Sequence, residues 1–160
     1  RESGLERERA DQLARLACGD LIEARRLVSG GDQMAAASFD MFCSLMRLSY
    51  SNKHLELLDW AEGFAALTRD RQIAFFGDAL RLLRESYMLT AGLSPISYLW
   101  GEEAAFCTKF APFVNNSNIE LLIGAFERTL RDVMANGNAR IVFIHFALAA
   151  SKFFLNKPTK

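Results

Sequence analysis

The side chains that most often bind metals or act as nucleophiles are few and widely spaced in this chain. The histidines are His54 and His145, and the cysteines are Cys18, Cys43 and Cys107. No second metal-binding residue stands at a suitable helical spacing from either histidine, so we expect no metal site. We expect His54 at the surface and His145 packed inside. Three separate cysteines without a C-x-x-C pair predict reduced thiols in a cytoplasmic protein.

The sequence also lacks the motifs that would support catalysis on phosphates or esters. It contains no G-x-x-x-x-G-K-[ST] loop, in which backbone amides and a lysine cradle a triphosphate, and no G-x-G-x-x-G. It contains no G-x-S-x-G turn that would expose a nucleophilic serine. Glu102 and Glu103 are adjacent, and Glu6 and Glu8 are two apart, so on a helix neither pair converges on one substrate atom. We therefore expect no enzyme activity and no cofactor.

Six other residues could contact a partner protein. Four arginines on the expected outer faces of two long helices could form ion pairs with a partner, or could simply keep those faces solvated. Two aromatic residues in a loop beside Pro95 could anchor a partner, as aromatic hot spots do, or could close one end of a helical bundle. These candidate residues are Arg81, Arg84, Arg128, Arg131, Tyr98 and Trp100.

The length and charge of the chain limit what kind of protein it is. Its 160 residues, 51% of them hydrophobic, suit one globular domain. Its 19 basic and 19 acidic residues balance, which argues against nucleic-acid binding by charge alone. No apolar run reaches the roughly 18 residues that a membrane span requires. The charged start, without an initiator Met, does not fit a signal peptide and indicates a piece of a longer protein.

The residue types predict an all-α fold, a helical bundle preceded by two short helices. Leu and Ala greatly outnumber the β-branched residues, and no segment alternates apolar and polar residues for long. Two adjacent glycines at 30–31 separate a charged pair of short helices from a more apolar bundle. Helices are predicted at 5–18, 20–28, 32–50, 53–67, 69–91, 101–110, 118–135 and 139–155.

Polar residues and glycines between these helices predict where each one begins and ends. Ser51-Asn52 is expected to cap the helix that follows it, and Ser117 with Glu120 forms a capping-box pattern. We expect Gly137 in the left-handed conformation and Asn138 as the cap of the last helix.

The apolar positions predict which helix faces point inward. In the helix at 69–91, Arg81 and Glu85 are expected to face outward. Glu127 and Arg131 are spaced for an i,i+4 ion pair on a wet face. The helix at 139–155 is apolar almost all round in its middle, so we expect it to be the central, most enclosed helix.

Three segments carry a resemblance to a known family. Residues 13–28 read LARLACGDLIEARRLV, a helix ending in Ala-x-Gly-Asp followed by a helix with Ala-x-x-Leu. This segment resembles the end of the lid subdomain in clamp-loader subunits of the AAA+ superfamily. Residues 110–119, FAPFVNNSNI, and 135–143, ANGNARIVF, lie in a part that resembles the carboxy-terminal collar domain of the bacterial DNA polymerase III delta-prime subunit.

The resemblance implies a domain organisation and a function. Residues 1–30 would be the tail of the lid subdomain, and residues 31–160 a collar domain. The collar would hold gamma/tau and delta subunits together in a five-membered ring, supporting sliding-clamp loading in DNA replication. Other modules of the full protein would handle ATP and DNA.

One departure from the family pattern bears on which type of clamp-loader subunit the chain resembles. Ile22 stands where active members of the superfamily carry an arginine that contacts the triphosphate. The isoleucine fits the delta-prime type, which does not hydrolyse ATP, and counts against the gamma/tau motor type. Arg25 and Arg26, one turn later, keep that second type open.

A different class of protein also remains open. A helical ligand-binding domain of a transcription regulator would hold its ligand among phenylalanines, although phenylalanines at helical spacing more often form a core. Upstream sequence would separate the two classes, because a regulator would carry a helix-turn-helix and a clamp-loader subunit an ATPase fold. The phenylalanines in question are Phe39, Phe42, Phe76, Phe126 and Phe146.

Overall fold

The computed structural model of the protein describes residues 32–92 and 101–154. Within these ranges the chain forms six α-helices, one 3-10 helix and no strand, which confirms the predicted all-α fold. The predicted helices at 5–18 and 20–28 lie outside the described residues. The elements are α3 (Asp32–Tyr50), α4 (His54–Ala65), α5 (Arg69–Thr90), α6 (Gly101–Phe110), η3 (Ala111–Phe113), α7 (Ile119–Met134) and α8 (Ala139–Lys152).

The chain divides into two compact units between Ala37 and Ser38, inside α3. The predicted boundary at residues 30–31 and the lid-like segment at 13–28 lie outside the described residues, so both stay predictions. The packing described next is that of the second unit, from Ser38 to Phe154.

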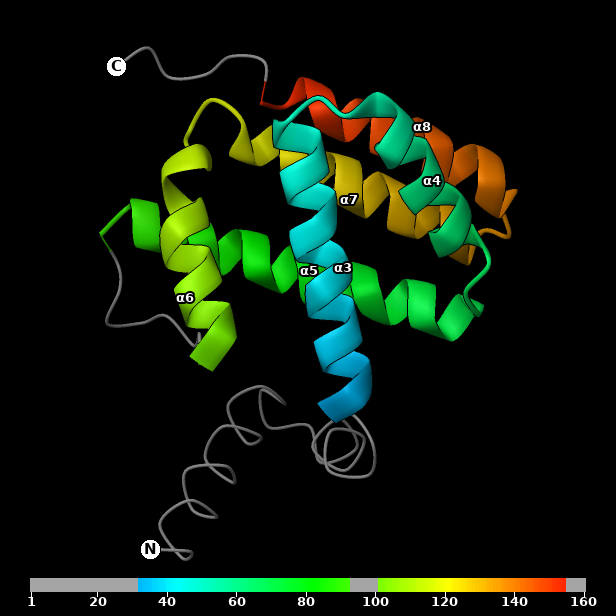
Figure 1. The fold of residues 1–160 in the computed structure, drawn as a ribbon, viewed down its shortest axis with the longest axis horizontal. Coiled ribbons are helices and arrows are strands. Elements are labelled where there is room, and N and C mark those ends of the chain that lie inside the picture. Colours follow the sequence, from blue (N-terminus) through cyan, green and yellow to red (C-terminus); the bar gives the residue numbers. More distant parts are fainter. Residues whose placement is uncertain (1–31, 93–100, 155–160) are drawn as a thin grey trace, which may run out of the picture. The chain divides into compact units, whose positions relative to one another are not determined.

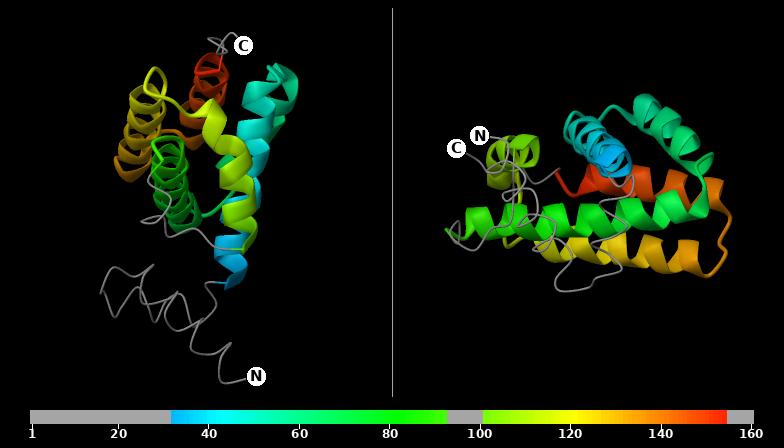
Figure 2. Two further views of the ribbon diagram at one scale, coloured as in Figure 1. Left: turned by 90° about the vertical axis from the view of Figure 1, so that its left-hand side faces the viewer. Right: turned by 90° about the horizontal axis from the view of Figure 1, so that it is seen from below.

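The helices of the second unit pack in two layers (Figures 1 and 2). α5, α7 and α8 lie side by side in one layer, and α3, α4 and α6 cover one face of it. α3 and α6 cross the helices beneath them, whereas α4 packs extensively against α8. This arrangement places residues of α3 beside residues of α6, although the two helices are far apart in the sequence.

Phenylalanine rings fill the space between the two layers. Phe76 of α5 is fully buried, and its ring centroid lies 5.8 Å from that of Phe126 and 5.3 Å from that of Phe146. Phe42 of α3 joins the cluster from the other layer, 6.5 Å from Phe126. Edge-to-face ring pairs each contribute about 0.5–1.5 kcal/mol beyond the burial of their area. The aromatic content of the sequence is therefore used mainly to join the layers.

The longest helix, α5, packs against α6, η3 and α7. Its buried residues include Glu85, which is only 7% exposed. Arg81 is partly buried as well, with 26% of its side chain exposed. The prediction that both residues face outward is wrong, because α6 covers the side of α5 that the sequence pattern assigned to water.

The last helix, α8, is less enclosed than its apolar sequence predicts. It packs chiefly against α4 and α7. Ile141 near its start is 69% exposed, and His145 is also exposed. The prediction that His145 is packed inside is wrong, whereas the surface position of His54 is confirmed. A helix at the edge of a layer leaves one side free, and apolar residues on that side stay at the surface.

Several helix ends fall where the sequence predicts them. α3 and α6 have the predicted bounds, and α5 ends at Thr90 before Gly92, whose φ is +76°. The predicted Ser51-Asn52 cap of α4 is wrong: the residue before the helix is Lys53, and its side chain makes no capping hydrogen bond. Asn52 instead adopts a left-handed φ of +54° inside the turn.

Candidate functional site

Arg81 is held by Glu103 of α6 and is not a free surface arginine. Its Nη1 donates to Glu103 Oε2 at 3.0 Å, and its Nη2 donates to Oε1 at 2.8 Å. Burial alone lowers the pKa of Arg81, but the hydrogen bond and charge of Glu103 outweigh it, so the net pKa is raised. The arginine proposed from sequence for a partner is therefore used to fix α6 against α5.

Arg84 connects α5 to α7 at the surface of the bundle. Its Nη2 donates to Glu127 Oε1 at 3.3 Å, and the two side chains are 54% and 42% exposed. The predicted ion pair between Glu127 and Arg131 is wrong, because Glu127 pairs with the neighbouring helix instead. An exposed pair of this kind contributes about 0–1 kcal/mol.

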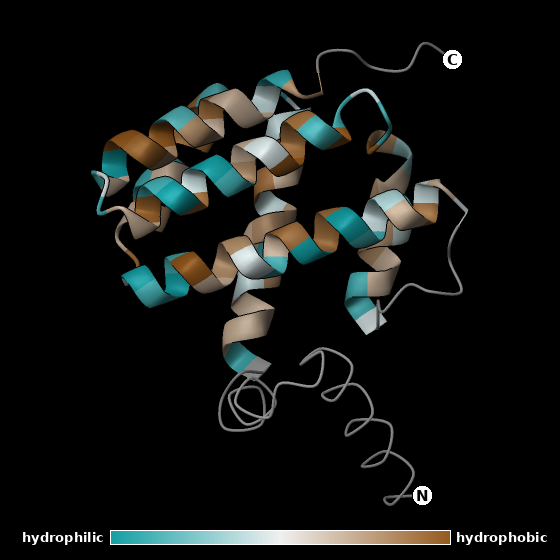
Figure 3. Ribbon diagram, turned by 180° about the vertical axis from the view of Figure 1, so that it is seen from behind, coloured by the Kyte–Doolittle hydropathy of each residue, from teal (hydrophilic) through white to brown (hydrophobic). Residues whose placement is uncertain are grey.

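The remaining two arginines share the outer side of α7 with an apolar residue. Arg128 and Arg131 are exposed, and Leu121 is 57% exposed. Their spacing places them on one side of the helix, which we call the α7 face. A Cβ added at Gly124 would meet Arg128 Nη1 at 3.3 Å, so the Arg128 side chain folds back over that glycine. Figure 3, which views this layer from behind, shows hydrophilic and hydrophobic residues interspersed along α7.

The two aromatic candidates, Tyr98 and Trp100, lie outside the described residues. The structure therefore leaves both alternatives for them, a partner anchor and a plug of the bundle, as predictions.

The phenylalanines considered as a ligand pocket occupy the core. Phe42, Phe76 and Phe126 are 0% exposed, and their rings contact one another. Phe146 is 1% exposed and lies 4.8 Å from Phe126, ring centroid to ring centroid. Phe39 is partly exposed and contacts Phe106 of α6. These rings fill the interior by packing on each other.

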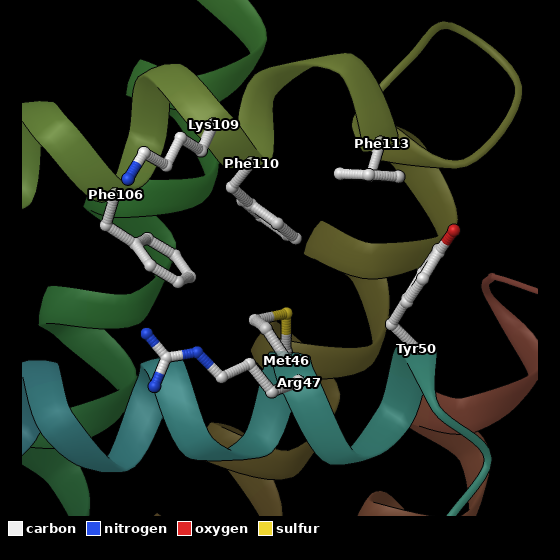
Figure 4. A pocket seen from close by; sticks show the side chains of 7 residues that line it. All are labelled: Met46, Arg47, Tyr50, Phe106, Lys109, Phe110 and Phe113. Carbon is white, nitrogen blue, oxygen red and sulfur yellow. The ribbon is translucent and has the colours of Figure 1, made fainter.

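A pocket does occur in the second unit, at a different place. It has room for about 200 Å³ and lies where α3 crosses α6 and η3 (Figure 4). α3 supplies one wall and α6 with η3 supplies the other. Sequence reasoning missed it because its two walls come from segments far apart in the chain. Its lining residues are Met46, Arg47, Tyr50, Phe106, Lys109, Phe110 and Phe113.

The pocket combines an apolar interior with two cations at one end. Figure 4 shows Arg47 and Lys109 at the end formed by Phe106, with Tyr50 and Phe113 at the other end. The guanidinium carbon of Arg47 lies 5.7 Å from the Phe106 ring centroid, a cation–π distance. Within the described ranges no carboxylate pairs with either cation.

The corner before α7 is built on asparagine side chains. Asn118 is 8% exposed, accepts a hydrogen bond from the Asn115 backbone N–H at 2.9 Å and donates to the Phe113 carbonyl at 2.8 Å. The predicted capping box of Ser117 and Glu120 is wrong, because Asn118 precedes the helix and bonds backward to the turn. The family-like segment 110–119 therefore contains the residues that fix this turn.

The corner after α7 also depends on asparagines. Asn136, not the predicted Gly137, adopts the left-handed conformation, with φ +64°. Arg69 of α5 donates to Asn136 Oδ1 and to the Val133 carbonyl, which closes the end of α7. The predicted cap at Asn138 is confirmed, since its side chain accepts from the Ile141 backbone N–H at 3.2 Å.

Position 137 needs a glycine for steric reasons, and not because of its backbone conformation. A Cβ at this position would lie 2.9 Å from the Asp132 carbonyl oxygen and 3.1 Å from Val142 Cγ2. The family-like segment 135–143 is thus a turn in which two asparagines and one glycine each have a defined task.

The described cysteines are free and buried. Burial raises the pKa of Cys43 to about 12 and that of Cys107 to about 11. No cluster of three or more metal-binding side chains occurs in residues 32–92 and 101–154. Among the helices described, none combines the length and the apolar character that a membrane crossing requires.

No protein-family model, no curated protein and no solved structure matches this chain.

Proposed function

We propose that this chain is the subunit-assembly module of a bacterial DNA polymerase III clamp loader, of the delta-prime type, without catalysis of its own. Its partners in this proposal are the gamma/tau and delta subunits of the ring that loads the sliding clamp in DNA replication. Residues 1–30 would be the tail of the lid subdomain, and residues 31–160 the collar domain. We also propose a cytoplasmic location, which agrees with the free thiols of Cys43 and Cys107.

The observation that supports this proposal most is the structural role of the residues that carry the resemblance. Segments 110–119 and 135–143 form the corners on either side of α7, and their asparagines bond to backbone groups or adopt a left-handed φ. A resemblance at residues that form turns is more specific than a shared helical pattern, because few residue types can adopt the conformation and make the hydrogen bonds of a given turn.

The α7 face supplies a surface of the required kind. Arginine is enriched at protein interfaces, and Leu121 adds an exposed apolar side chain beside Arg128 and Arg131. Unlike Arg81 and Arg84, these two arginines form no ion pair with the described residues. They are therefore available to acidic groups of a neighbouring subunit.

The test is co-elution of the chain with purified gamma/tau and delta subunits on size-exclusion chromatography. We expect the wild-type chain to enter a complex, and the single variants Arg128→Glu and Arg131→Glu to weaken it by about tenfold or less, since rim charges act mainly on association. Lys53→Glu is the control, because it makes a similar charge reversal at the residue before α4, which lies in the other layer. Lys53 pairs with Glu56 at 2.9 Å on the surface, so a thermal melt checks that this variant stays folded.

Two outcomes would contradict parts of this account. A wild-type chain that never co-elutes with either subunit type would refute the assembly function. Normal assembly by well-folded Arg128→Glu and Arg131→Glu chains would leave the function standing and would place the contact on another surface.

A further inference from the structure

We propose that the pocket between α3 and α6–η3 receives one large apolar side chain from an acidic peptide segment of a partner protein. The proposal rests on the assembly function proposed above, but it concerns a surface separate from the α7 face. It assigns a task to Arg47, Lys109 and the aromatic residues around them.

The size of the pocket favours a side chain over a small-molecule ligand. Its room of about 200 Å³ is below the roughly 300–1,000 Å³ of most small-molecule sites. A volume of this size suits one aromatic or long aliphatic side chain, the kind of anchor that dominates many protein interfaces. The apolar walls, Met46, Phe110 and Phe113 among them, would remove such a side chain from water.

The charges at the mouth select the residues next to that anchor. Arg47 and Lys109 are both exposed and lie at the same end of the pocket (Figure 4). Arg47 stands over the ring of Phe106, which holds its guanidinium at the rim. Two cations beside an apolar hollow are complementary to a large apolar residue flanked by aspartate or glutamate.

The walls of the pocket are held open by contacts among themselves. The ring centroids of Phe106 and Phe110 are 5.5 Å apart in a stacked arrangement, and those of Tyr50 and Phe113 are 4.8 Å apart. Phe110 also contacts Phe42 of the core. A site fixed in this way loses little conformational freedom when it binds, which favours its use for recognition.

The experiment is a titration of the ¹⁵N-labelled full chain with three capped seven-residue peptides, followed by NMR. The first has a central phenylalanine flanked by aspartates, the second replaces that phenylalanine by alanine, and the third replaces the aspartates by asparagines. We expect the first peptide to shift amide signals of α3 and α6 around Arg47 and Lys109. We expect each of the other two to bind at least about tenfold more weakly, a factor that corresponds to 1.4 kcal/mol.

Two variants and one control test whether the peptide binds at the pocket or elsewhere on the surface. Lys109→Glu and Arg47→Gln should each weaken the first peptide about fivefold or more, because they remove the charge that the aspartates meet. Arg71→Glu, a charge reversal at an exposed residue of α5 that does not line the pocket, should leave its binding unchanged. Thermal melts of all three variants confirm that each chain is folded.

The results that would overturn the proposal are distinct from a failure of the assembly function. If the first peptide shifts no pocket amide while the chain still co-elutes with clamp-loader subunits, the pocket is not a docking site and the assembly function stands. If 4-phenylbutyrate binds as tightly as the first peptide, the pocket takes small carboxylates instead. If the first peptide binds Lys109→Glu and Arg47→Gln as tightly as it binds the wild-type chain, the two cations do not select the occupant and the proposal is wrong.

Discussion

At the scale of single residues, asparagines shape both ends of α7, and each does so differently. Asn118 bonds to two backbone groups of the turn before the helix, Asn136 takes the left-handed conformation after it, and Asn138 caps α8. Short amide side chains suit these tasks because they both donate and accept, and because they tolerate a positive φ. Replacing one of them therefore has an effect that depends on which of its atoms is used.

The amide donor of Asn118 is expected to be essential to its turn. Asn118→Asp keeps an acceptor for the Asn115 N–H but places a carboxylate against the Phe113 carbonyl, so we expect the free energy of unfolding to fall by about 1–3 kcal/mol. The matched control is Asn116→Asp, because Asn116 is exposed and uses only its Oδ1, as acceptor for the Tyr87 hydroxyl. Urea unfolding measures both, and equal losses in the two variants would show that the donor of Asn118 does not matter.

The buried thiols are expected to be inert in the native chain. Because burial raises the pKa of Cys43 to about 12 and of Cys107 to about 11, both stay protonated at pH 8, and only the thiolate attacks a disulfide reagent. In a Cys18→Ser chain we expect no rapid reaction with Ellman's reagent at pH 8, and two reactive thiols in 6 M guanidinium chloride. Rapid native labelling of either cysteine would show that this part of the core opens readily.

At the scale of the elements, α6 is fixed to α5 by a charged pair as well as by apolar contacts. The Arg81–Glu103 pair is bidentate and about three-quarters buried. Breaking one side of such a pair leaves the other charge with poor solvation, which costs more than the pair itself contributes. This pair also explains why Arg81 is unsuitable as a probe of partner binding.

Reversing one charge of this pair is expected to destabilise the fold. Arg81→Glu should lower the free energy of unfolding by about 2 kcal/mol, because two carboxylates would then face each other. The double variant Arg81→Glu/Glu103→Arg restores opposite charges and should recover at least half of that loss. Thermal melts of the two single variants and the double variant form the test, and a double variant as unstable as the sum of the singles would show that the pair is not a unit.

The sequence predicted helices better than it predicted what surrounds them. The bounds of α3 and α6 were predictable, and so was the end of α5 near Gly92, because glycine and helical periodicity act locally. The partial burial of Arg81 was not predictable from the sequence, since it depends on where α6 packs. Asn136, not Gly137, takes the left-handed conformation after α7, and Gly137 is needed because a side chain there would collide with the Asp132 carbonyl, a contact that exists only in the folded turn.

The candidate sites also differ in how far the sequence could predict them. Arg128 and Arg131 were predictable as exposed, because α7 has a regular apolar stripe on its other side. The pocket could not be predicted, although Phe106, Phe110 and Phe113 have helical spacing. Recognising it requires the knowledge that α3 crosses α6, which no local pattern contains.

At the scale of the whole molecule, the balance of 19 basic and 19 acidic residues is expected to prevent tight binding to DNA. Affinity for a phosphate backbone comes from displaced counterions and requires clustered Lys and Arg. We expect fluorescence anisotropy with primed DNA to show a dissociation constant weaker than about 10 µM at 150 mM salt. Tighter binding with a steep salt dependence would reveal a basic surface that overall charge conceals.

The central claim is that this chain assembles with clamp-loader subunits, and native mass spectrometry of the reconstituted mixture tests it most directly. Equimolar chain, gamma/tau and delta subunits are mixed, and the mass of the complex gives the number of copies of each. The account predicts a single five-subunit species that contains one copy of this chain, and no such species when the delta subunit is left out. A mixture that shows only free chain, or this chain bound to itself, would contradict the claim.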